Sequence, residues 1–212
     1  MQLKEKKSHS PKYLNLNSKK KPVEIGFLKK NLFFIVLFAV TFLVFGNGIG
    51  NDYALDDDFY TAGGNKLTTM GVRGIPQIFK NHTFYNNDGT GYSYRPVALA
   101  TFAIENSFFG ENPHVSHFLS VLLYALCIVI LFSLLRKWFN SQGNWFSFFI
   151  CLLFLVHPLH TEVVDNIKCR DELLALFFIL LTFHALWKYI ETKKLVYLIL
   201  YPILFTAGLL SK

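Results

Sequence analysis

Three consecutive carboxylates, Asp56, Asp57 and Asp58, form the most concentrated set of chemically active side chains in the sequence. Each ionised neighbour raises the work of ionising the next, so such a cluster needs a cationic or hydrogen-bonding partner. One carboxylate there can act as a general base that takes a proton from a hydroxyl group, while its neighbours orient a sugar or hold a divalent cation. The alternative is a solvated loop start or a helix cap, which is the commoner role of an acidic triplet.

A second set occupies residues 157–162, with the sequence HPLHTE. Its proline is expected to break or kink a helix, and the freed backbone groups must then pack against protein or line a wet cavity. His157 and His160 lie three residues apart, as do His114 and His117, so a zinc centre is one alternative. Histidines near span ends are more often hydrogen-bonded or solvated, and none lies in an HExxH pattern, so no metal site is predicted from them.

Charged side chains follow at residues 168–172. Arg170 or Lys168 could hold a phosphate group, because a guanidinium binds it bidentately and an ammonium binds it as a point charge. An ion-pair cluster at a helix start explains the same residues equally well, since Asp171 and Glu172 there favour the positive end of the helix dipole.

The elements that must position these residues are membrane helices. Of the 212 residues, 52% are hydrophobic and 17% are charged, which is too apolar for a soluble domain. A bilayer core takes roughly 20 residues of helix. The sequence therefore predicts an all-α integral membrane protein with about five spans, at residues 31–51, 112–135, 138–161, 173–190 and 195–211. The fourth is the shortest, and Lys188 must extend its ammonium to the headgroups for that span to cross.

Composition also excludes several classes of protein. The three cysteines form no close pairs and no CxxC, so neither a disulfide scaffold nor a thiolate zinc site is indicated. The basic residues lie next to apolar segments, which argues against a nucleic-acid partner.

The placement of charge predicts the orientation. Residues 1–30, 136–144 and 188–194 hold 14 of the 21 lysines and arginines but only three acids, so the positive-inside rule places them in the cytoplasm. Residues 1–30 are expected to be a disordered basic tail ahead of a transmembrane domain at 31–212. The acids and histidines then lie together outside the cytoplasm, and a bacterial inner membrane is favoured over an endoplasmic reticulum membrane.

The loop at residues 52–111 is too long and too varied for a linker, so it is expected to be structured. Its last part, 97–109, follows Pro96 and interrupts apolar residues with small and polar ones, which predicts an amphipathic helix at the membrane interface.

The order of these short motifs resembles the integral-membrane GT-C glycosyltransferases. The motifs are two aspartates after the first span, Tyr-Arg-Pro at 94–96, Asn-Pro at 112–113 with His117 at the start of the second span, HPxHTE at 157–162, Arg-x-Glu at 170–172 and a final Ser-Lys. The resemblance covers about residues 27–212 and is closest to the transmembrane and tetratricopeptide-repeat protein O-mannosyltransferase family and its bacterial relatives.

The resemblance implies transfer of a sugar, typically mannose, from a polyprenyl-phosphate carrier in the bilayer to a hydroxyl group of a protein or glycan, with inversion at the anomeric carbon. By that likeness Asp56 or Asp57 is the catalytic base, and basic residues neutralise the carrier phosphate. The substrate-binding side chains that the motifs imply are Tyr94, Arg95, His117, His157, His160, Glu162, Arg170, Glu172 and Lys212.

The sequence departs from the family pattern in three places. Cys169 stands where the family usually has glycine, Asp58 is an extra acid, and the chain stops at Lys212 without a helical repeat of the 34-residue kind. We therefore expect the N-terminal portion of a longer family member. A non-catalytic assembly or partner-docking protein and an inactive fragment remain alternatives. A transporter is less favoured, because its acids would lie in mid-span.

Overall fold

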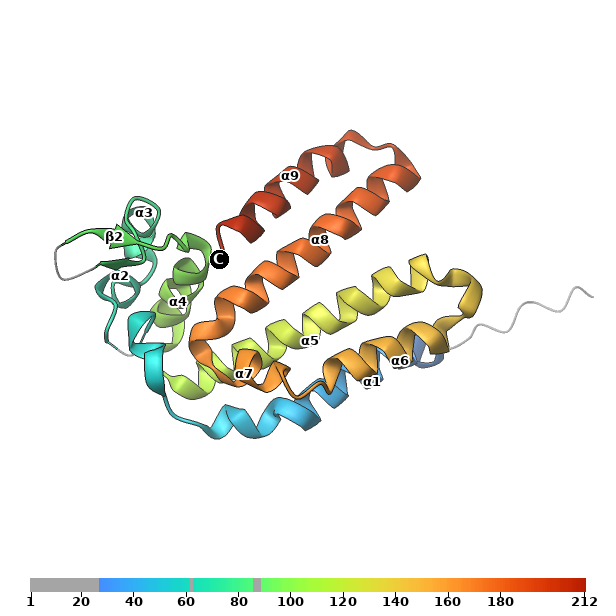
Figure 1. The fold of residues 1–212 in the computed structure, drawn as a ribbon, viewed down its shortest axis with the longest axis horizontal. Helices are drawn as coiled ribbons and strands as arrows, with labels where there is room; N and C mark the ends of the chain where they lie inside the picture. The colour runs from blue at the N-terminus through green and yellow to red at the C-terminus, as the bar shows by residue number, and fades with distance from the viewer. Residues whose placement is uncertain (1–26, 62, 86–88) are drawn as a thin grey trace, which may run out of the picture. The chain divides into compact units, whose positions relative to one another are not determined.

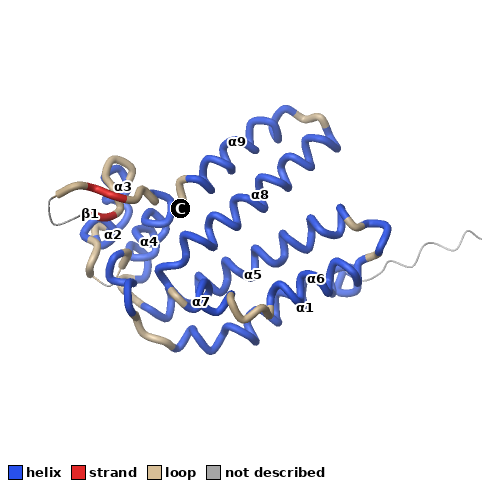
Figure 2. The backbone as a smooth tube through the Cα atoms, viewed as in Figure 1, coloured by secondary structure: helices blue, strands red, loops and turns tan. Residues whose placement is uncertain are grey.

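The computed structural model describes residues 27–61, 63–85 and 89–212, and the chain separates into two units at residues 1–31 and 32–212. The predicted basic tail falls almost wholly on residues 1–26, which lie outside the described residues. The second unit is largely helical, with one two-stranded sheet among its described residues (Figures 1 and 2).

Long helices make up most of this unit. They are α1 (Phe27–Phe45), α4 (Pro96–Phe109), α5 (Pro113–Trp138), α6 (Asn144–Leu155), α8 (Arg170–Thr192) and α9 (Leu195–Leu209). In Figure 1, α8 lies between α5 and α9, and α6 runs beside α5 on its other side. The ends of α5 and α8 that carry Ser116 and Arg170 meet, so these two helices run in the same direction.

Within the described part of the chain, three helical stretches are long and apolar enough to cross a membrane: Asn31–Gly50, Pro113–Trp138 and Ile167–Thr192. The first holds most of α1, and the other two contain α5 and α8. Each corresponds to a predicted span, and α8 is longer than the span expected there, because its helix starts at Arg170 and continues past Lys188 to Thr192. The other two expected spans contain α6 and α9, which have 12 and 15 residues. At about 1.5 Å per residue, α6 is much shorter than the roughly 30 Å bilayer core.

The third expected span differs from the prediction at both ends. Residues 138–143 complete α5 and form the turn η4 (Asn140–Gln142), where Gly143 has a positive φ of 81° that favours glycine. At the other end the helix stops at Leu155, just before Pro158, as the sequence predicts. A new short helix, α7 (His160–Asp165), then begins.

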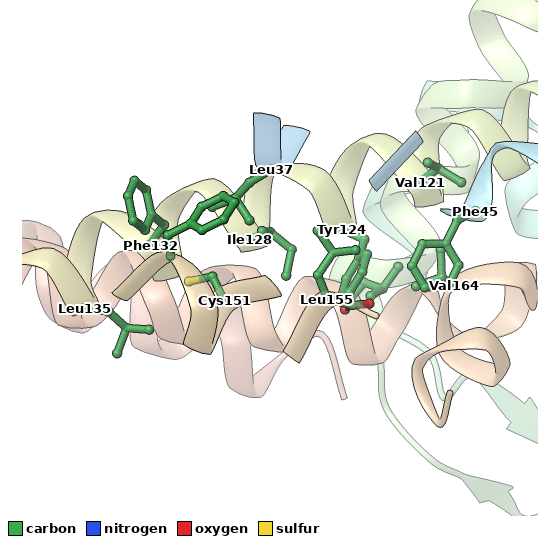
Figure 3. Packing of buried hydrophobic residues seen from close by; sticks show 12 residues of the cluster. Leu37, Phe45, Val121, Tyr124, Ile128, Phe132, Leu135, Cys151, Leu155 and Val164 are labelled. Carbon is green, nitrogen blue, oxygen red and sulfur yellow. The ribbon is translucent and has the colours of Figure 1, made fainter. Parts of the chain in front are cut away.

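Packing between α1, α5 and α6 forms the main apolar core. Figure 3 shows side chains of this core from these three helices, together with Val164 of the short helix α7. The fully buried members include Leu37, Ile128 and Cys151. Small polar residues such as Ser120 and Ser147 are also fully buried, and small side chains let membrane helices approach closely.

The segment between α1 and α5 contains several short elements among its described residues. It contains the short elements η1 (Gly46–Gly50), η2 (Leu55–Phe59), α2 (Lys66–Thr69), η3 (Gly71–Gly74), α3 (Ile75–Ile78), β1 (Phe84–Tyr85) and β2 (Gly91–Tyr92). The predicted helix after Pro96 is α4. A second core made of Tyr60, Ile78, Leu99, Phe102 and Ile167 packs these pieces against the start of the segment that leads into α8.

Candidate functional site

The acidic triplet lies in the turn η2, and its second carboxylate is tied to the backbone at two places. Asp57 is only 2% exposed. Its Oδ2 accepts the amide N–H of Ala54 at 2.9 Å, and its Oδ1 accepts the amide N–H of Lys168 at 3.0 Å, from a residue 111 positions away. Because both carboxylate oxygens accept backbone hydrogen bonds, Asp57 fixes η2 against η5 (Ile167–Cys169).

The two neighbouring carboxylates have different surroundings. Asp56 has a side chain that is 49% exposed, and it forms an ion pair with the ammonium of Lys168. Asp58 is exposed. The triplet thus consists of one backbone-held carboxylate, one accessible carboxylate beside a cation, and one solvated carboxylate. The sequence argument required a cationic or hydrogen-bonding partner for the triplet, and that partner is Lys168. Its ammonium pairs with Asp56, and its backbone N–H donates to Asp57.

Asp57 lies at the wall of a cavity of about 220 Å³, which we call the acidic cavity. The cavity is lined by residues of the segment after α1, of α5 and of α7 with the residue that follows it: Asn51, Asp52, Ala54, Asp57, His117, Thr161, Glu162, Asp165 and Asn166. His117 is 3% exposed, and its Nδ1 makes no hydrogen bond among the described residues. The same is true of Oδ1 of Asp165, within the part of the chain that is described.

Asp165 is the carboxylate of this cavity whose protonation is most affected by its surroundings. Burial raises the pKa of its carboxyl group above the usual value, and the nearby His117 partly offsets that rise. A proton is therefore held more tightly on Asp165 than on a solvated aspartate.

Arg95 forms the second polar cluster, just before α4. Its guanidinium pairs with the buried carboxylate of Asp171 and donates to the hydroxyl of Tyr60 at 3.0 Å. Burial, with the nearby charge of Asp171, raises the pKa of Tyr60 to about 12. The side chain of Arg95 is 24% exposed, and that of Asp171 is 3% exposed.

Arg170 has a different ion-pair partner from Arg95 and is 3% exposed. Its guanidinium pairs with Glu105 of α4 at 2.5 Å, donates to the carbonyl of Ser116 of α5 at 2.9 Å, and stacks 4.1 Å from the centre of the Phe102 ring. It is not among the residues that line the acidic cavity. These contacts correspond to the ion-pair alternative of the sequence analysis.

Most of the remaining site residues of the sequence analysis make contacts away from the lining of the acidic cavity. Glu172 pairs with Lys212, and each side chain is 42% exposed. His160 contacts the hydroxyl of Tyr124 at 2.6 Å, and His157 is exposed beside it, with 5.8 Å between the two ring centres. Tyr94 donates its hydroxyl to the carbonyl of Phe79 at 2.8 Å. Of the predicted substrate-binding residues, only His117 and Glu162 line the acidic cavity.

The described residues provide no set of ligands for the divalent cation expected at the acidic triplet. Among the residues that the structure describes, no three histidine, cysteine, aspartate or glutamate side chains gather in a way that could hold a metal ion. We do not propose such a site further.

Sequence reasoning missed two acids that matter to the geometry, Glu105 and Asp165. Glu105 is the one charged residue in a helix whose other residues are apolar, small or uncharged polar, and that isolation signals a buried cationic partner. Nothing in the local sequence distinguishes Asp165, because its position depends on how α7 packs beside α5 and η1.

Comparison with known proteins gives a consistent set of relatives. The model of the family described as dolichyl-phosphate-mannose-protein mannosyltransferase matches residues 93–212. The protein O-mannosyl-transferases TMTC2 of mouse and human are each 29% identical to the chain over 167 residues, which are 75% of the chain and 19% of the relative. Human protein O-mannosyl-transferase TMTC1 is 36% identical over 92 residues, which are 43% of the chain and 10% of the relative. The chain thus spans about a fifth of the length of TMTC2, and no solved structure matches it.

Proposed function

Because the chain belongs to the dolichyl-phosphate-mannose-protein mannosyltransferase family, we propose that it takes part in transferring a mannosyl group from a polyprenyl-phosphate carrier to a hydroxyl group of a protein or glycan. The observation that carries this proposal is the meeting of η2 with the segment before α8. It sets a half-exposed carboxylate, Asp56, against a cation, Lys168, at one end of helices long enough to span a membrane.

In this proposal Asp56 is the general base and Asp57 is a positioning residue. The acceptor oxygen attacks the anomeric carbon, its proton passes to the carboxylate of Asp56, and the bond from that carbon to the phosphate oxygen breaks. The polyprenyl phosphate leaves with the bonding electrons. A phosphate needs little protonation to leave, so one carboxylate suffices, unlike the pair used by inverting glycosidases. Asp57 suits the base role less well, because both its oxygens already accept backbone hydrogen bonds.

Lys168 and Lys212 are the accessible cations for the carrier phosphate, with side chains 33% and 42% exposed. A bound phosphate would compete with Asp56 for the ammonium of Lys168, and the carboxylate would then be free to accept the proton. Arg170 is too enclosed to serve in this way, so we assign it to holding α4 in place.

The test compares Asp56→Asn with Asp58→Asn, its neighbour in the same turn. Mannosyl transfer from polyprenyl-phosphate mannose to an acceptor peptide is measured with the chain in proteoliposomes, together with binding of the donor. Loss of a general base lowers the rate by about 10²- to 10⁴-fold. We expect that loss for Asp56→Asn with donor binding retained, and transfer close to that of the unsubstituted chain for Asp58→Asn.

Equal transfer by Asp56→Asn and the unsubstituted chain would overturn the base assignment. If the unsubstituted chain neither binds the donor nor transfers from it, while it still captures a protein partner, the non-catalytic docking alternative is favoured.

A further inference from the structure

A second polar cavity lies at the opposite ends of α5 and α8, away from the acidic cavity. Its volume is about 460 Å³, and it is lined by Ser133, Arg136, Lys137, Asn140, Asn144, Trp187 and Glu191. We call it the basic cavity. Lys137 follows His117 by 20 residues of the same helix, a rise of roughly 30 Å, so the two cavities lie about one bilayer thickness apart.

The ammonium of Lys137 is the unusual group in this cavity. Its Nζ is enclosed and makes no hydrogen bond or ion pair with any described residue, and the face of the Trp187 ring lies 5.9 Å away. Glu191, the carboxylate of the cavity, is already used: Trp187 Nε1 donates to it at 2.6 Å and Lys188 Nζ donates at 3.1 Å. The charge of Glu191 acts on the ammonium from nearby, but no hydrogen bond or ion pair among the described residues holds Nζ. An enclosed charge held so weakly is costly, so this position favours an anionic ligand.

Arg136 supplies the second cation of the basic cavity. Its Nε donates to Oδ1 of Asn144 at 3.0 Å, which fixes the guanidinium at the turn into α6. The rings of Phe34 and Phe132 lie 5.5 Å and 5.6 Å from its central carbon. A fixed guanidinium fork beside an ammonium is the arrangement that binds phosphate, the fork by paired hydrogen bonds and the ammonium as a point charge.

The surroundings of the basic cavity favour a phosphate that is part of a lipid. The cavity lies at the ends of two helices that are long and apolar enough to span a bilayer, where headgroups lie. Trp138 and Phe183 are each about half exposed and pack edge to face next to it, with ring centres 6.1 Å apart. An amphiphile could therefore place its phosphate between Arg136 and Lys137 and its chains along this exposed apolar face.

We propose that the basic cavity binds the phosphate of an anionic glycerophospholipid headgroup. The bound lipid joins the end of α5, the turn before α6 and the end of α8, because the cavity is lined from all three. This site is separate from the proposed sugar transfer and does not depend on it.

The test measures binding of phosphatidylglycerol and of phosphatidylcholine to the whole 212-residue chain in detergent by native mass spectrometry. The double variant Arg136→Gln/Lys137→Gln is compared with Lys193→Gln/Lys194→Gln. The control pair removes the same charge from exposed residues just after α8, neither of which lines the cavity. We expect the affinity for phosphatidylglycerol to fall about tenfold in the cavity variant, because a charge-assisted hydrogen bond is lost there. In the control variant the affinity should change little.

Three outcomes would overturn the proposal. An equal loss in both double variants would mean general attraction of charge to the membrane surface. Equal affinity for phosphatidylcholine would exclude a site for anionic headgroups. Binding of inorganic phosphate as tight as that of phosphatidylglycerol would assign the cavity to a free anion.

A second variant guards against misfolding. Lys137→Met removes the enclosed charge without opening a void, so its thermal midpoint without anionic lipid should equal or exceed that of the unsubstituted chain. Adding phosphatidylglycerol should raise the midpoint of the unsubstituted chain and leave that of Lys137→Met unchanged. The same rise in both proteins would contradict the role of Lys137.

Discussion

At the scale of single residues, Asp165 shows how one partly buried acid can be costly for stability. Its Oδ1 lies so close to the backbone of Gly48 that a methyl group at residue 48 would be 2.7 Å from it. No described residue donates a hydrogen bond to this oxygen. The ionised form is therefore poorly solvated, which is why burial raises its pKa.

This raised pKa gives a prediction with a definite sign. A carboxyl group whose pKa is higher in the folded state favours folding when it is protonated, and that contribution is lost as the pH rises through the folded-state pKa. Asp165→Asn mimics the protonated form. It should raise the thermal midpoint at pH 7, and the gain should vanish below about pH 4, where aspartate is protonated in the unfolded chain as well. Midpoints measured from pH 3 to pH 8 test this; a midpoint lowered at pH 7 would contradict it.

At the scale of elements, the pair between Arg170 and Glu105 fastens the loop helix α4 to α5 and α8. Both side chains are about 95% buried, and the guanidinium also holds the carbonyl of Ser116. Removing one partner of such a pair leaves an uncompensated buried charge, whereas replacing both by apolar residues can cost little.

Glu105→Gln should therefore lower the free energy of unfolding by about 3 to 5 kcal/mol, and the double variant Glu105→Leu/Arg170→Met should recover most of that loss. Unfolding in mixed detergent micelles, followed by circular dichroism, provides the measurement. If the double variant is as unstable as Glu105→Gln, the pair has a specific role beyond charge compensation.

At the scale of the whole molecule, the contacts bring together the segments that charge placement assigns to each side of the membrane. The two lysine- and arginine-bearing links meet at the basic cavity. Acids of the loop and of α7 meet His117 of α5 at the acidic cavity. The orientation itself is a prediction. The family and the three long apolar helices support a membrane protein.

Cysteine accessibility tests that orientation. In a chain whose Cys127, Cys151 and Cys169 are replaced by alanine, Thr69→Cys should react with a membrane-impermeant thiol reagent in intact cells. Ser141→Cys, in the turn η4, should react only after the membrane is permeabilised. Both positions are exposed, so a lack of reaction reflects sidedness and not burial. The reverse pattern would invert the predicted topology.

Much of the element structure could be predicted from the sequence alone, because it depends on local chemistry. Long apolar runs with few charges become long helices, Pro96 starts α4, and the proline at 158 separates α6 from α7. The predicted third span is longer than the helix α6 found there, because the absence of charged residues does not reveal the turn at residues 139–143. The presence of chemically active side chains in two distant segments was also visible, and alternating spans predicted that they share one face.

Only the tertiary structure decided which of those side chains act together. Asp57 and Lys168 are 111 residues apart, and Arg95 and Asp171 are 76 apart, so no local pattern specifies these partners. The pairing distinguishes an accessible Asp56 from a backbone-held Asp57. It also gives Arg170, for which the sequence leaves a phosphate role and an ion-pair role open, a buried ion pair with Glu105. The physical reason is that burial and the distance between charges determine what a carboxylate or a guanidinium can do, and both are set by packing.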